Sequence, residues 1–142
     1  MTIKNVMKAT AVATGLVSLL SLSTADSFAG NNPKEEVIRI DSEKAYLHQA
    51  DILIRTNPAN ARMMYQIVKS NEEKTGKKSE MLLDAYQGIA ESYYREKSYD
   101  NAINAAKAGL KIFPDDWTLR RDVENYQDAK GRLMISNIQM HL

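Results

Sequence analysis

Apolar residues recur every three or four positions through most of the chain, which is the spacing of a single helix face. The most regular stretch follows Ser79, and its apolar stripe consists of Leu82, Ala85, Tyr86, Ile89, Ala90 and Tyr93. Polar residues occupy the other faces of this stretch. No segment alternates convincingly with a period of two, so the pattern predicts an all-α fold.

Residues suited to helix ends divide this pattern into separate predicted helices. Asn, Ser and Asp favour helix starts, whereas glycine and proline favour helix ends. Such residues stand between the apolar stripes at Asn57, Pro58, Gly76, Ser79, Ser98, Pro114 and Asp116. The first predicted helix spans about 42–55, and the last begins at about Trp117. A start at Asn32-Pro33 remains open, because proline fits the first turn and the following glutamates favour its positive end.

A different pattern occupies the amino terminus. Two lysines precede an uncharged stretch over 9–25, and Ser27-Phe28-Ala29 offers small residues at a cleavage site. This order predicts a secretory signal peptide over 1–29, cleaved after Ala29. The uncharged stretch is shorter than the roughly 20 apolar residues that span a bilayer, which favours cleavage over the alternative of an uncleaved anchor. We therefore expect a periplasmic or secreted protein, with an amino-terminal arm over 30–41 and no stable membrane insertion after cleavage.

Composition excludes several classes of function. The segment 1–29 carries two of the 19 basic and one of the 18 acidic residues, so the remaining chain has 17 of each. A neutral chain without a long basic stripe lacks the charge that nucleic-acid binding needs. The absence of cysteine excludes disulfides, thiolate metal sites and a cysteine nucleophile. His48 and His141 lie in no paired-ligand or triad motif, so we expect neither an enzyme nor a cofactor or metal site.

The segment from Leu83 to Asp116 combines large, small and proline positions at fixed offsets. They are Tyr86, the pair Ile89-Ala90, Tyr93, Ala102 and Pro114. These offsets resemble the tetratricopeptide repeat (TPR), a helical hairpin of roughly 34 residues. Ala106 and Gly109 depart from the family pattern, which usually has a bulky residue and an alanine there. The resemblance implies antiparallel helical hairpins that stack on one another.

The same resemblance gives a domain organisation for residues 42–142. The clearest repeat is 83–116, the preceding hairpin is a longer and degenerate copy, and residues 117–142 form a capping helix. About two repeats plus a cap make a small domain that can still fold. The alternative is an unrelated helical bundle, which would also pack helix on helix.

Repeats of this kind bind proteins or peptides on their concave face, which the first helix of each hairpin lines. The resemblance therefore implies a partner-binding surface formed by Asp84, Gln87, Glu91, Tyr94, Arg95, Arg121 and Asn125. Each of these residues taken singly also fits a solvated helix face. Tyr94 is the strongest candidate, because an exposed aromatic between Glu91 and Arg95 combines apolar area with orienting charges.

Two functions follow from these features. The first is an exported interaction module, an adaptor or assembly factor that holds another protein of an envelope or secretion complex. The alternative is a self-assembling subunit, a homo-oligomer that forms through stacked repeats and the carboxyl-terminal helix. That helix carries apolar residues which no following repeat covers, namely Met134, Ile135, Ile138, Met140 and Leu142.

Overall fold

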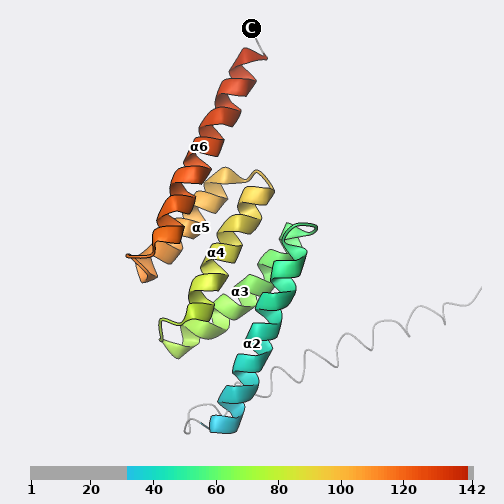
Figure 1. Ribbon diagram of the computed structural model, residues 1–142, viewed down its shortest axis with the longest axis vertical. Coiled ribbons are helices and arrows are strands. Elements are labelled where there is room, and N and C mark those ends of the chain that lie inside the picture. Colours follow the sequence, from blue (N-terminus) through green and yellow to red (C-terminus); the bar gives the residue numbers. More distant parts are fainter. Residues whose placement is uncertain (1–31, 141–142) are drawn as a thin grey trace, which may run out of the picture. The chain divides into compact units, whose positions relative to one another are not determined.

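The computed structural model describes residues 32–140 of the 142-residue chain. Within that part it contains five helices and no strand, which confirms the predicted all-α class there (Figure 1). The helices are α2 (Pro33–Leu53), α3 (Pro58–Thr75), α4 (Glu80–Arg95), α5 (Tyr99–Ile112) and α6 (Trp117–Gln139). The predicted signal peptide with its cleavage position, and also His141 and Leu142, lie outside the described residues.

Packing divides the chain after Val37. Of the first unit the structure describes only residues 32–37, where α2 begins. The second unit starts at Ile38 and contains the rest of α2 and the four following helices. In it, α3 packs against α4, α4 against α5, and α5 against α6. None of the helices in residues 32–140 combines the length and the apolar character needed to cross a membrane.

Local capping chemistry explains where α3, α4 and α6 begin. The side chains of Asn57, Ser79 and Asp116 each accept a hydrogen bond from the backbone N–H three residues later. These bonds satisfy amides that the first turn of a helix leaves unpaired. Gly76 closes α3 in the left-handed conformation, with φ at 67°, and Lys97 takes the same conformation after α4, with φ at 60°. The predicted starts of these three helices and the predicted end of α3 are confirmed.

The start of α2 differs from the predicted helix over 42–55. The helix begins at Pro33, where the Asn32 side chain accepts a hydrogen bond from the Lys34 N–H. Ser42 does not cap a helix, because its hydroxyl donates to the Ile38 carbonyl one turn earlier. A serine bonded in this way fits inside a helix. The predicted arm is therefore helical from residue 33, as the start left open at Asn32-Pro33 requires.

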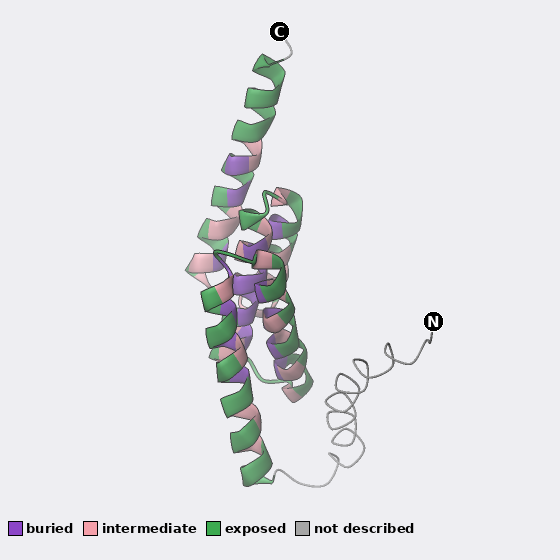
Figure 2. Cartoon of the chain, turned by 90° about the vertical axis from the view of Figure 1, so that its right-hand side faces the viewer, coloured by how far each residue is buried: buried purple, intermediate pink, exposed green. Residues whose placement is uncertain are grey.

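Two clusters of buried side chains hold the helices of the second unit together. Figure 2 colours the buried residues along the chain in purple. The first joins α2, α3 and α4 through Leu47, Ala50, Ile54, Ala61, Tyr65, Val68, Ala85 and Ile89. The second joins α4, α5 and α6 through Ala90, Ala102, Ile103, Ala106, Leu119 and Tyr126. Since α4 contributes to both clusters, it connects the two halves of the core.

Two glycines allow the helices to approach closely. A Cβ atom on Gly88 of α4 would lie 2.4 Å from the ring of Tyr65 on α3. A Cβ atom on Gly109 of α5 would lie 2.8 Å from Leu119 Cδ1 on α6 and 3.0 Å from Tyr86 Cβ on α4. Real Cβ atoms do not approach other atoms so closely, so the absence of a side chain sets the distance between these helices. This contact explains the glycine at position 109.

We expect Gly88→Ala to destabilise the protein by about 1–3 kcal/mol, because the added methyl group displaces the buried Tyr65 ring. Chemical denaturation followed by circular dichroism measures this change. Gly131→Ala in α6 is the matched control, since a Cβ there meets no atom within 4 Å. We expect that variant to be about 0.5–1 kcal/mol more stable, through helix propensity alone. Equal effects of the two substitutions would contradict the packing argument.

Candidate functional site

An open hollow of about 450 Å³ lies between α4 and α6. From α4 it is lined by Gln87, Glu91 and Tyr94, and from α6 by Thr118, Arg121, Asp122, Asn125, Tyr126, Asp128 and Arg132. The α6 residues recur every three or four positions, which places them along one side of that helix. We call this feature the α4–α6 hollow.

The hollow brings together most of the predicted partner-binding residues. Gln87, Glu91, Tyr94, Arg121 and Asn125 all line it. Asp84 and Arg95 are exposed on α4 but do not line the hollow. Arg95 instead contacts a residue of the hollow, because its guanidinium group forms an ion pair with the Glu91 carboxylate at 2.5 Å.

Sequence analysis missed the contribution of Thr118, Asp122, Asp128 and Arg132. The spacing of polar residues on α6 carried a usable signal, since positions 118, 122, 125, 128 and 132 follow one helix side. Tyr126 is buried in the second cluster, yet it also lines the hollow.

Aromatic side chains form one wall of the hollow. The ring of Tyr94 stacks on that of Tyr126, with centroids 4.7 Å apart and an interplanar angle of 24°. Tyr94 also contacts Tyr99 in a tilted arrangement, with centroids 5.8 Å apart. Tyr94 is 37% exposed, whereas Tyr126 is buried. The stack holds the Tyr94 ring in place while leaving part of it open to a partner.

The charges in the hollow are mixed and unevenly paired. Glu91 is bound by Arg95, and the Arg121 guanidinium lies 4.7 Å from the centre of the exposed Trp117 ring. Asp122 makes no hydrogen bond or ion pair with any described residue. Burial raises the pKa of Asp122, and the nearby Glu91 and Asp116 carboxylates raise it further, against the opposing effect of Arg121. The hollow therefore holds a partly desolvated carboxylate available to a ligand.

The histidine that the structure describes lies outside this hollow. His48 is exposed on α2, far along the chain from the residues of the hollow. Within residues 32–140, no group of three or more His, Cys, Asp or Glu side chains is arranged to hold a metal ion. The chemistry that the hollow offers is recognition through a half-exposed ring, amide groups and charges of both signs.

Asp122→Asn should stabilise the protein at pH 7. The raised pKa means that folding disfavours the ionised carboxylate, and asparagine removes that charge without changing the shape. As the pH falls through the pKa of Asp122, the wild-type side chain becomes neutral and the advantage of the variant should disappear. Thermal unfolding at pH 7 and pH 3 measures the difference. Asp128→Asn is the control, and a gain as large in that exposed position would refute the role of desolvation.

Comparison with protein-family models, with curated proteins and with solved structures found no match to this chain. The function therefore has to be inferred from the residues and the geometry of the chain itself.

Proposed function

We propose that this protein is an exported, TPR-like interaction module, an adaptor or assembly factor that binds a segment of another protein in the α4–α6 hollow. One observation carries the proposal: five of the seven residues predicted from the sequence as a binding face, on two helices that α5 separates along the chain, line one open hollow. A solvated helix face does not require such convergence. Export and a periplasmic or secreted location rest on the sequence of residues 1–29.

Packing of the best-matching repeat supports the TPR-like part of this proposal. Ala90 and Ala102 are fully buried in the second cluster, as small residues at a helix crossing must be. Gly109 stands against Tyr86 and Leu119, so a residue smaller than the family's alanine permits a closer approach. Pro114 lies two residues after the end of α5, at the place of the family's terminal proline. In this arrangement α6 is the capping helix.

The composition of the hollow indicates the kind of segment it binds. Its exposed ring favours an apolar or aromatic anchor, and the unpaired Asp122 and Asp128 favour a basic side chain beside that anchor. Arg121 and Arg132 can donate hydrogen bonds to an acidic group on the same segment. A protein segment supplies this mixture, whereas nucleic acid presents a uniformly negative backbone. No cofactor and no catalytic step is part of the proposal.

The test is photo-crosslinking in the intact cell envelope of the native host. A photoreactive amino acid at Asn125, in the hollow, should capture a defined protein, and Tyr94→Ala should reduce that capture at least several-fold by removing the anchor. The same probe at Asn104, exposed on α5, is the matched control and should not capture this protein. Mass spectrometry of the product also identifies its amino terminus, for which we expect Gly30.

Equal capture from both positions, or capture unaffected by Tyr94→Ala, would contradict binding in the hollow. Recovery of the chain with residues 1–29 still attached would instead favour the uncleaved anchor. The crosslinks would then remain the test of binding in the hollow.

A second function, self-association through α6, is favoured by the exposed end of that helix. Beyond Ala129, its last buried residue, apolar side chains lie open to solvent (Figure 2). They are Leu133, Met134, Ile135, Ile138 and Met140, exposed by 41% to 74%. An apolar stretch of this kind is typical of an interface.

Light scattering at micromolar concentration tests this alternative. If α6 mediates self-association, the wild-type protein should be a dimer or larger, and Ile138→Gln should shift it towards the monomer. Ile52→Gln on α2 is the matched control, because its exposure of 57% is close to the 62% of Ile138. A wild-type protein that is strictly monomeric would exclude self-association and leave the adaptor function in place.

A further inference from the structure

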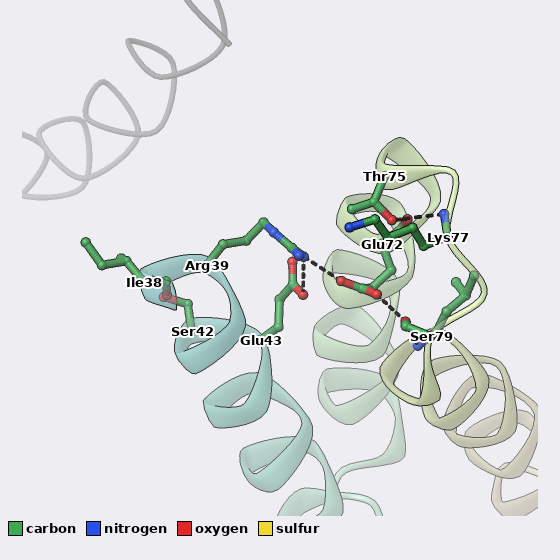
Figure 3. Close-up of polar contacts among 9 residues, drawn as sticks. Ile38, Arg39, Ser42, Glu43, Glu72, Thr75, Lys77 and Ser79 are labelled. Atoms are coloured by element: carbon green, nitrogen blue, oxygen red, sulfur yellow. Dashed lines mark hydrogen bonds and ion pairs between the residues drawn. The ribbon is translucent and has the colours of Figure 1, made fainter. Parts of the chain in front are cut away.

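Two glutamates are buried within a group of charged and polar side chains where α2 meets α3, away from the α4–α6 hollow. Arg39 and Glu43 come from α2, Glu72 comes from α3, and Ser79 comes from the connection to α4 (Figure 3). Arg39 Nη1 lies 2.7 Å from Glu43 Oε2 and 2.5 Å from Glu72 Oε1. One nitrogen of the guanidinium group thus joins the two helices by bridging two carboxylates.

The charges in this cluster do not balance. Glu43 is 1% exposed and Glu72 is 2% exposed, so two buried carboxylates share a single guanidinium group. The Ser79 hydroxyl donates a hydrogen bond to Glu72. By contrast, Glu43 Oε1 is buried and has no hydrogen-bond partner. It is the only buried side-chain nitrogen or oxygen atom in residues 32–140 of which this is true. An ionised carboxylate with a buried, unpaired oxygen is costly, and a bound proton removes that cost.

Surrounding groups determine which carboxylate holds the proton. Burial and the neighbouring Glu72 carboxylate raise the pKa of Glu43 to about 7, against the opposing effect of Arg39. For Glu72, the effect of burial is outweighed by the neighbouring Glu43 and by the hydrogen bonds from Ser79 and Arg39, so its pKa is lowered. Glu72 therefore stays ionised while Glu43 carries the proton.

We propose that the Arg39–Glu43–Glu72 cluster is a proton-dependent latch, in which one proton bound at Glu43 holds α2 against α3 and its loss loosens α2. The charged groups that face Glu43 are Arg39 on its own helix and Glu72 on α3. The α3–α4 connection adds the Ser79 hydroxyl and Lys77, whose backbone N–H donates to Thr75 (Figure 3).

Loosening of α2 would uncover a specific apolar surface. Leu47, Ala50 and Ile54 cover part of the first cluster on α3 and α4. Beyond them, the Tyr65 hydroxyl donates a 2.5 Å hydrogen bond to Asp51, which is another polar contact between the two helices. The latch therefore controls access to a surface that is separate from the α4–α6 hollow, and it does not depend on the function proposed for that hollow.

The sign of the pH dependence follows from proton binding. The latched state holds a proton up to a pH near 7, whereas a loosened α2 releases it near the ordinary carboxyl pKa of about 4.5. Between these values, loosening releases one proton. The equilibrium constant for opening should therefore rise by up to about tenfold per pH unit and level off above pH 7.

Hydrogen exchange of the α2 amides from pH 5 to pH 8.5, corrected for the intrinsic exchange rate, measures this constant. Glu43→Gln is a neutral side chain of the same shape, and we expect it to abolish the pH dependence while leaving α2 latched at high pH. Glu124→Gln, exposed on α6, should keep the wild-type slope. Amides of α5 and α6 should show a much weaker dependence, because α2 opens without them.

A wild-type slope of zero, or the same slope in Glu43→Gln, would overturn the latch. An equal slope in α5 and α6 would also overturn it, since the proton would then control global unfolding and not α2. If Glu43→Gln does not fold, the ¹³C resonance of the Glu43 carboxyl in the wild-type protein provides the test. A titration midpoint near 7 supports the latch, and a midpoint near 4.5 excludes it.

Discussion

The architecture depends on how closely α4 can approach the helices on either side of it. Gly88 admits the Tyr65 ring of α3, and Gly109 on α5 leaves room for Leu119 of α6 and for Tyr86. A methyl group at either position would push the helices apart by distances that a close-packed interior does not absorb. The hollow between α4 and α6 exists because α5 seats both helices at this short separation. The candidate site is thus a consequence of core packing.

Much of the fold could be predicted from the sequence because its signals are local. A cap such as Ser79 acts on an amide three residues away, and a closing glycine such as Gly76 acts on its own backbone. Such effects are readable without knowledge of the rest of the chain. The start of α2 was misplaced for a related reason, because a serine hydroxyl can make either of two local hydrogen bonds. It can cap the start of a helix, or it can donate to a carbonyl one turn earlier inside a helix, as Ser42 does. The sequence does not choose between these two bonds.

Long-range contacts account for what sequence analysis missed. Nothing in the sequence marks Glu43 and Glu72 as buried, yet both are buried around Arg39, and Glu72 is 33 positions from that arginine. Likewise, Tyr126 occupies an apolar stripe that does not reveal its stacking on Tyr94. Helical periodicity places a residue on a face, but it does not state which other face lies opposite. The repeat resemblance supplied an expectation about the opposite face, and Gln87, Glu91 and Tyr94, which it predicted on α4, line the hollow.

Asp122 and Glu43 differ in how well their surroundings can solvate a negative charge. Asp122 is half-buried in an open hollow, where water or a partner still reaches its charge, so it loses only part of its solvation in the free protein. Glu43 has no such exposure, and only a proton or Arg39 can offset its charge. A hydrophobic residue at that position would hold α2 more simply and without any dependence on pH. An unbalanced pair of carboxylates there instead ties the docking of α2 to proton concentration, which is a property that packing alone cannot provide.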